Sequence, residues 1–365
     1  MYDIAVIGAG INGSCITYEL TSAGKEVILF DGGGIASGGS GAAGAFISPK
    51  FSKSGDLKDI LHSAFCYSLD FYEKNFSDLF TKCPLLHIAK DEVDDVTLRI
   101  YKEKTDLELL DAPWQERETV SINAGIVNAK SMCEALSKSA NFKEEEIVSL
   151  EYADGVWIIN KSYSAKEVVL ATGAYKTLLN EPYIKLRGVW GHRIDVKTST
   201  DNAHSIHQFV SISPSKRGLL SIGATHNVHY HPETAEEEYD IQEGRMELLE
   251  KASHSIHLEN IEIIEDYMGL RSGSFDYMPM VGPLVKSRET LQSDTIHFQT
   301  KKPDFTSYTY YPNLTMINGS GGYGFVLAPY LAKILVEYIL SGKEVGKKVH
   351  PARFFARWAK KRSEG

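Results

Sequence analysis

Two stretches of the chain fit one glycine pattern, G-x-G-x-x-G: GAGING at residues 8–13 and GSGGYG at residues 319–324. Glycines at this spacing allow a tight turn and a close approach of phosphate oxygens to backbone amide groups. The pattern alone is weak evidence, because short glycine motifs also occur where ordinary helices begin. The elements expected around each copy therefore decide what each could bind.

The first copy has every flanking feature of a dinucleotide site. An apolar run at residues 2–7 predicts a buried parallel strand, and residues 11–23 predict a helix that ends at Gly24. The start of this helix offers free amide groups and a partial positive charge to a pyrophosphate. The next apolar run ends on Asp31, whose carboxylate can accept hydrogen bonds from ribose hydroxyls. The sequence therefore predicts a bound dinucleotide.

The segment that follows indicates which dinucleotide. Residues 32–49 are rich in glycine and carry no charge, so they cannot form a packed element of their own. Such a segment is understandable as backbone wrapped around a bulky ligand. A flavin ring needs this wrapping and an exchangeable nicotinamide does not, so we expect FAD.

The second copy lacks the ribose-binding half of a nucleotide site. It follows the apolar run 314–318 and precedes a helical pattern at 325–340, but no second strand with an acidic residue comes after it. What it offers is a helix N-terminus suited to negative charge on a flavin ring. We therefore expect one FAD held by two helix ends; the alternative is a helix-start loop packed tightly against a strand.

Six segments spread over nearly the whole chain carry a family resemblance: GAGING with Asp31, ASGGSGAAGAFISP at 36–49, VVLATGAY at 168–175, LLSIGAT at 219–225, GLRSGSFDYMPMVGP at 269–283 and INGSGGYGFVLAP at 317–329. In this order they resemble the D-amino-acid-oxidase superfamily of FAD-dependent oxidoreductases, which includes glycine and sarcosine oxidases. Within it, FISPKF, SIGATH and HPARFFARWAKK look similar to the oxidoreductase domain of the bifunctional tRNA-modifying MnmC proteins. The methyltransferase half of those proteins has no counterpart here, so one activity at most is expected.

The resemblance implies an α/β (α+β) fold with two parts. A Rossmann-like FAD-binding domain of the glutathione-reductase type would be assembled from residues 1–50, 125–185 and 312–342. An antiparallel-sheet substrate domain would use residues 51–124 and 186–311, and residues 343–365 would form a basic C-terminal tail.

The resemblance also implies the cofactor contacts. The sarcosine-oxidase relatives attach flavin to a cysteine near the segment that holds Arg271 here; no cysteine lies there, so FAD is expected to be noncovalent. The expected cofactor-binding residues are Gly8, Gly10, Gly13, Asp31, Ser37, Ser40, Gly41, Ala43, Gly44, Val148, Ala171, Thr172, Gly173, Arg271, Gly319, Gly321, Gly322, Tyr323 and Gly324.

The chemistry that the resemblance implies is amine oxidation. An amine loses hydride from its α-carbon to FAD, and water hydrolyses the imine. An MnmC-like enzyme would act on carboxymethylaminomethyl-uridine in tRNA, giving aminomethyl-uridine and glyoxylate. The alternatives are an oxidase or dehydrogenase of free glycine, sarcosine or a D-amino acid, and an inactive flavoprotein that serves as a binding module.

The expected catalytic residues are Arg271 and Tyr323, and the resemblance implies Arg271 because it matches the carboxylate-binding arginine of glycine-oxidase-type enzymes. The planar fork of Arg271 suits a substrate carboxylate, and the alternative is a structural arginine paired with Asp276. Two residues near the expected carboxylate site depart from the family pattern. Tyr323 stands where relatives often have arginine, and Ser211 stands near the position of a strand tyrosine in glycine oxidases.

Two histidine groups remain. His226, His229 and His231 have spacing that a metal could use, but amine oxidation by flavin needs none, so no metal is expected. His192 and Arg193 could line the pocket or cap a strand.

Composition and charge constrain the partners. The 365-residue chain has a net charge of −9, begins without a secretory leader and has no apolar run of membrane-spanning length, so a cytoplasmic protein without membrane contact is expected. Residues 343–365 carry +6, and on a helix Arg353, Arg357 and Lys361 would form a basic stripe beside Phe354 and Trp358. This stripe could meet tRNA phosphates or be a solvated end, so the partner is tRNA or a small amino-acid substrate.

Overall fold

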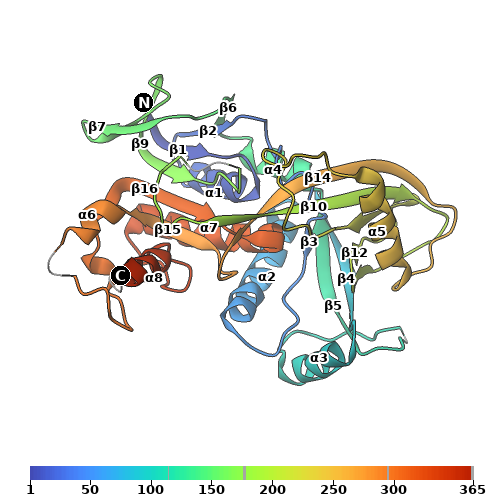
Figure 1. The fold of residues 1–365 in the computed structure, drawn as a ribbon. Coiled ribbons are helices and arrows are strands. Elements are labelled where there is room, and N and C mark those ends of the chain that lie inside the picture. The colour runs from blue at the N-terminus through green and yellow to red at the C-terminus, as the bar shows by residue number, and fades with distance from the viewer. Residues whose placement is uncertain (114, 176–177, 294–295, 363–365) are drawn as a thin grey trace.

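The computed structural model describes residues 1–113, 115–175, 178–293 and 296–362. Its core is two eight-stranded sheets, which lie on the left and on the right of the view in Figure 1. The first sheet has the order β15-β16-β9-β1-β2-β6, with a β7–β8 hairpin beside β9. Its strands are β1 (Tyr2–Ile7), β2 (Val27–Asp31), β6 (Asn141–Glu144), β7 (Leu150–Ala153), β8 (Val156–Ile159), β9 (Tyr163–Leu170), β15 (Met280–Val285) and β16 (Tyr310–Asn318).

Strands β16, β9, β1, β2 and β6 run parallel, and β15 is an antiparallel edge. The last four residues of β1 are buried on both faces, as expected for a parallel strand covered by helices. One face packs against helices α1, α4 and α7, and the other packs against α8. These helices are α1 (Ile11–Ser22), α4 (Ala129–Ser137), α7 (Gly324–Ser341) and α8 (Ala352–Arg362).

The second sheet has the order β14-β10-β13-β12-β11-β4-β5-β3. Its central feature is the long antiparallel pair of β10 and β14, which places Val189 opposite Arg271. The strands of the second sheet are β3 (Phe46–Ile47), β4 (Phe80–Ile88), β5 (Thr119–Val127), β10 (Leu186–Lys197), β11 (Ser205–His207), β12 (Ser211–Ile212), β13 (Leu219–Gly223) and β14 (Glu262–Ser274). The remaining α-helices are α2 (Asp56–Asn75), α3 (Glu92–Lys104), α5 (Ile241–Ser253) and α6 (Ser287–Leu291).

The observed sheets agree with the expected α/β class. Residues of β1, β9 and β16 are far apart in sequence and adjacent in space. Strand β15 pairs with β16 in the first sheet, although its residues fall inside the segment 186–311 expected for the substrate domain. The first sheet therefore extends by one antiparallel edge strand, β15, beyond the segments expected for the FAD-binding domain.

Helix α7 is a core helix that packs against the first sheet. Within the described residues, the stretch Gly321–Ser341 is the single helical segment whose length and apolar composition would also suit a membrane span. Half of it is buried inside the protein, and it packs on both α1 and α2. Its burial accounts for its apolar composition without a membrane.

Candidate functional site

The two glycine-rich loops lie at the carboxyl edge of the parallel sheet, where β1 and β16 end. Gly8 has a φ of 104°, and a side-chain carbon there would lie 2.3 Å from the carbonyl oxygen of Ala171 after β9. A side-chain carbon on Gly13 would lie 1.7 Å from the carbonyl oxygen of Gly8. These two glycines are therefore required for packing the loop against β9 and against α1.

Direct hydrogen bonds join the two loops. The hydroxyl of Ser320 donates to Asn12 Oδ1 at 3.1 Å. Buried Asn318, the last residue of β16, donates through Nδ2 to the carbonyl of Gly173 at 3.0 Å and accepts from Ser272 Oγ at 2.8 Å. One asparagine thus connects the loops after β9 and β16 to β14. Sequence reasoning did not identify Asn318; a polar residue that ends an apolar strand just before a glycine loop was the available signal.

The segment 32–45 folds back over the start of α1. Asp31 accepts hydrogen bonds at Oδ2 from the amide of Ala9 (2.8 Å) and at Oδ1 from the amide of Gly33 (3.0 Å) and the hydroxyl of Ser37 (3.1 Å). Ser40 Oγ accepts from the amide of Ile11 at 2.9 Å. A carboxylate has about four acceptor positions, so Asp31 retains capacity for a ribose hydroxyl.

The residues at this edge fit an extended dinucleotide. A side-chain carbon on Gly173, Gly321 or Gly322 would meet no atom within 4 Å, so the backbone after β9 and β16 faces open space. At Gly10 the near neighbour is the end of the Ser40 side chain, at 2.9 Å. Exposed backbone at two strand ends, with an acceptor at the end of β2, is the arrangement that a pyrophosphate and a flavin ring require.

The other residues expected at the cofactor lie along the same edge or in the covering segment. Val148 is 68% exposed, and its amide donates to Asn160 Oδ1 at 2.9 Å, so only its side chain and carbonyl are available to a ligand. It follows β6, whose Glu144 pairs with Asp31. Gly41, Ala43 and Gly44 lie in the segment over α1, Ala171 and Thr172 follow β9, and Gly319 and Gly324 flank the single 3-10 turn before α7.

Arg271 is a half-buried cation without an acidic partner among the described residues. Its Nη1 donates to the carbonyl oxygen of Thr225 at 3.1 Å, and burial lowers the pKa of its guanidinium. A side-chain carbon on Gly191 would lie 2.5 Å from its Nη2, so glycine leaves the room that the guanidinium occupies. The alternative pairing with Asp276 is wrong, because Arg353 binds that carboxylate through Nε and Nη2, both at 3.0 Å.

Tyr323 ends the 3-10 turn before α7. Burial raises the pKa of its phenol, which therefore stays protonated at neutral pH. The ammonium of Lys50 lies 6.0 Å from the centre of its ring. Tyr323 and Arg271 come from segments that touch, since Gly273 and Ser320 form an isolated bridge between β14 and the second glycine loop.

His192 and Arg193 were expected either to line the pocket or to cap a strand, and of the two it is Arg193 that lies on the face of the sheet that carries Arg271. Side chains alternate along β10, so His192 faces away from Val189 and its partner Arg271. Its Nε2 lies 2.8 Å from Asp266, which also binds Arg245. Arg193 is held by Asp195 at 2.9 Å within the sheet. His192 is thus paired on the face opposite Arg271, whereas Arg193 lies on the same face as Arg271, with its guanidinium 3.8 Å from the centre of the Tyr267 ring.

Ser211 and the histidines complete the set of candidates. Ser211 lies in β12 opposite Gly223. His226 is exposed, and desolvation together with nearby Arg271 lowers its pKa. In the part of the chain that the structure describes, no three His, Cys, Asp or Glu side chains gather as a metal site.

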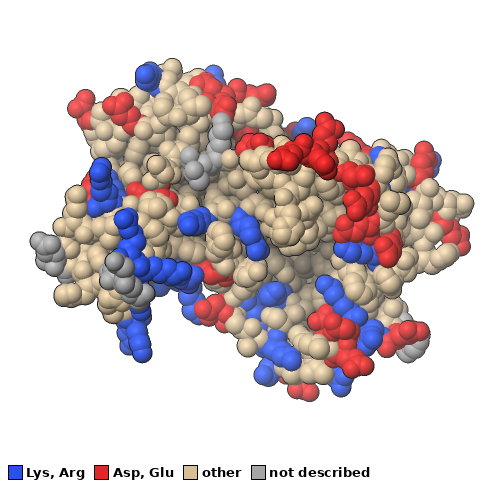
Figure 2. Space-filling view, in the orientation of Figure 1, with Lys and Arg blue, Asp and Glu red and all other residues tan. Residues whose placement is uncertain are grey.

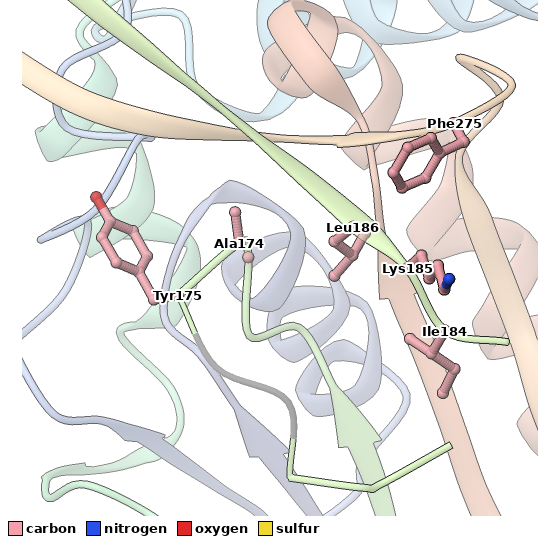
Figure 3. Close-up of a pocket in the computed structure, with 7 residues that line it drawn as sticks. Ala174, Tyr175, Ile184, Lys185, Leu186 and Phe275 are labelled. Atoms are coloured by element: carbon pink, nitrogen blue, oxygen red, sulfur yellow. The ribbon is translucent and has the colours of Figure 1, made fainter. Parts of the chain in front are cut away.

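A cavity of about 400 Å³ lies beside this edge, between the end of β9 and the start of β10. Gly173, Ala174 and Tyr175 form one wall, Ile184 to Leu186 another, and Phe275 lies at its rim (Figure 3). The hydroxyl of Tyr175 accepts from the amide of Leu270 at 3.1 Å, which connects this wall to the strand of Arg271.

Similarity to known proteins covers nearly the whole chain. The model of the family described as FAD dependent oxidoreductase matches residues 3–338. The chain is 22% identical to the tRNA 5-methylaminomethyl-2-thiouridine biosynthesis bifunctional protein MnmC of Legionella pneumophila (strain Lens), over 96% of this chain and 56% of that protein. It is 24% identical to the protein of the same name in Leptospira interrogans serovar Lai, over 98% and 61%. The chain thus spans little more than half the length of these curated relatives.

Solved structures share the fold. Glycine oxidase from Bacillus cereus superposes with a TM-score of 0.73 at 19% identity, covering 94% of this chain and 96% of that one. Iminodiacetate oxidase from Chelativorans sp. superposes with a TM-score of 0.70 at 15% identity, covering 95% and 98%. The similarity therefore extends over both sheets.

Proposed function

The chain belongs to the family of FAD-dependent oxidoreductases, and we propose that it oxidises the C–N bond of an N-substituted glycine, the carboxymethylaminomethyl group of wobble uridine in tRNA. The products are aminomethyl-uridine and glyoxylate. The observation that carries this proposal is Arg271, a half-buried guanidinium with one carbonyl partner and no acidic partner among the described residues.

An uncompensated buried cation needs an anion, and a carboxylate is the anion that a guanidinium binds through two parallel hydrogen bonds. A glycine unit supplies this carboxylate one bond from the carbon to be oxidised. Arg271 then fixes the α-carbon in position, and Gly191 keeps the space for the guanidinium open. The names of the MnmC relatives support the tRNA-borne form of this substrate.

The two helix ends would hold the cofactor. The start of α1 would take the pyrophosphate, Asp31 the ribose, and the amides of the loop 319–324 the negative charge of the reduced ring. Bound FAD would accept two electrons as the amine becomes an imine, which water hydrolyses. The neutral phenol of Tyr323 would supply a hydrogen-bond donor beside this ring.

The experiment that tests the substrate is mass spectrometry of tRNA nucleosides from cells with and without the gene. Accumulation of carboxymethylaminomethyl-uridine in its absence is the expected result. An unchanged nucleoside profile, with oxidation of free glycine or sarcosine by the purified protein, would instead establish the small-molecule oxidase. We also propose that FAD is noncovalent, so acid denaturation should release it intact into the supernatant.

A further inference from the structure

The turn after β14 exposes two aromatic side chains, Phe275 and Tyr277. Phe275 is 58% exposed and Tyr277 is 63% exposed, and no other phenylalanine or tyrosine in the described part of the chain is as exposed. Most other aromatic side chains lie within or against the hydrophobic clusters. Two well-exposed rings in one turn mark a contact surface more often than a stability element.

This turn is held rigidly. Asp276 Oδ1 accepts from Ser274 Oγ (3.0 Å) and from the amide of Met278 (3.2 Å), while Arg353 of α8 binds both carboxylate oxygens and the carbonyl of Met278. Tyr277 has a φ of 63°, in the left-handed region that non-glycine residues seldom adopt. A network that maintains such a conformation, and so keeps two rings in water, is typical of a functional turn.

Two unpaired cations lie next to the rings. Phe275 and Lys185 both line the cavity, and their side chains lie on the same side of the view in Figure 3. The guanidinium of Arg187 lies 5.4 Å from the centre of the Tyr277 ring, and its Nε is buried without a hydrogen-bond partner. Neither cation has an acidic partner among the residues described. In Figure 2, Lys and Arg side chains gather over α8 and around the nearby hollow, whereas acidic ones gather over α5.

The position of this surface relates it to the candidate active site. Arg187 pairs across the sheet with Gly273, two residues from Arg271 in β14. The same cavity reaches Gly173 at the open end of β9. A chain of nucleotides that brought one residue to Arg271 would therefore have its neighbours near Phe275 and Tyr277.

We propose that Phe275 and Tyr277 form a stacking platform for unpaired bases that flank the modified nucleotide, with Lys185 and Arg187 contacting the phosphates. The inference rests on the proposed function. Rings with adjacent cations are the combination that binds single-stranded nucleic acid, because every base has a face to stack and every linkage carries a charge. A protein partner would require an apolar groove around the rings, and here they are flanked by Lys185 and Arg187.

The test measures binding of a fluorescent anticodon stem-loop RNA to the FAD-bound protein as a function of salt. Phe275→Ala with Tyr277→Ala should weaken binding about tenfold or more at every salt concentration and leave the salt slope unchanged, since stacking is removed while the cations that meet the phosphates remain. Lys185→Ala with Arg187→Ala should make the slope shallower. Phe209→Ala, which removes a 39% exposed ring from the turn between β11 and β12, is the matched control and should bind as the parent does.

Equal RNA affinity of the parent and the double aromatic variant would overturn the platform and leave the proposed function intact. A parent that neither binds the RNA nor oxidises modified tRNA would overturn both. Because both rings are exposed, the variants should keep the parent melting temperature. If the double variant does not fold, Phe275→Ala alone decides: full affinity overturns the inference, and Phe275→Tyr should restore any loss.

Discussion

At the scale of single residues, Arg271 was identified from its motif, and the structure removes the structural pairing considered for it. Asp276 lies in the same motif, but it is bound to Arg353 and cannot compensate Arg271. A motif names residues but does not show which of them pair. The Arg271 guanidinium has no acidic partner in its motif because Arg353 of α8, about eighty residues further along the chain, binds Asp276.

Arg271→Met keeps the length of the side chain and removes the charged fork. If Arg271 binds a carboxylate, transition-state stabilisation should fall by about 1.5 to 3 kcal/mol, a roughly ten- to hundredfold slower flavin reduction by carboxylate-bearing amines. Stopped-flow absorbance of the flavin measures this. Gly191→Ala should reproduce part of the loss by displacing the guanidinium while the charge is retained. Unchanged reduction kinetics in both variants would assign Arg271 a structural role.

Gly10→Val tests the first glycine loop. The added carbon would lie 2.9 Å from Ser40 Oγ, the end of a side chain that can rotate away, so the chain should still fold. The branched side chain would then occupy the space that a pyrophosphate needs, and FAD occupancy should fall to near zero. The flavin-to-protein absorbance ratio is the measurement. Gly346→Val, at a position where a side chain meets no atom within 4 Å, should keep full occupancy; loss in both would make the effect nonspecific.

At the scale of elements, α8 shows where sequence reasoning succeeds and where it stops. The spacing of Phe354 and Trp358 predicted a helix docked by its aromatic side, and Phe354 is buried while Trp358 packs against the same cluster. The pattern also placed Arg353 on the basic stripe, and that part is wrong. Arg353 is 11% exposed at its side chain and holds Asp276, because helical spacing cannot show that a neighbouring turn supplies a carboxylate.

A buried histidine nitrogen in β11, the strand that pairs with β4, predicts a pH dependence of the free energy of unfolding. His207 Nε2 is buried without a hydrogen-bond partner, and burial lowers the pKa of His207 to about 4. Between the unfolded pKa of about 6.5 and the folded value, the unfolded chain binds more protons, so stability should fall as pH decreases through this window. His207→Phe should remove on the order of 2 kcal/mol of the stability difference between pH 7 and pH 5, measured by urea denaturation. An identical pH dependence in the variant and the parent would contradict this assignment. His204→Phe, at a half-buried histidine three residues before His207, is the matched control.

At the scale of the whole molecule, the family resemblance implied an FAD-binding part built from residues 1–50, 125–185 and 312–342. Strands β1, β9 and β16, one from each of these segments, are neighbours in the first sheet. The positions of Gly8 and Gly13 could be predicted because only glycine fits them. The role of Asn318, the pairing of β15 with β16 and the exposed turn at Phe275 could not, because each depends on contacts between segments far apart in sequence. The sequence showed that positive charge gathers in residues 343–365, but it could not show that Arg353 is bound to Asp276 while other cations of this segment stay exposed.

The exposed cations of the C-terminal helix provide the last prediction, although one of them, Arg357, also lies 3.8 Å from Asp276. Arg357, Lys361 and Arg362 remain largely exposed after Arg353 is excluded, and they continue the basic surface seen in Figure 2 over α8. If tRNA is the substrate, changing these three to Ala should reduce the salt slope of tRNA binding by a little under one for each phosphate that the helix no longer neutralises. Oxidation of a small N-alkyl glycine should not change. Lys104, Lys130 and Lys138, exposed on or next to α3 and α4, changed together to Ala, remove the same charge from another surface and should leave the slope as it is. An equal reduction in both triple variants would mean that net charge alone acts at long range, and no reduction in either would place the RNA path away from α8, on the side of Lys185 and Arg187.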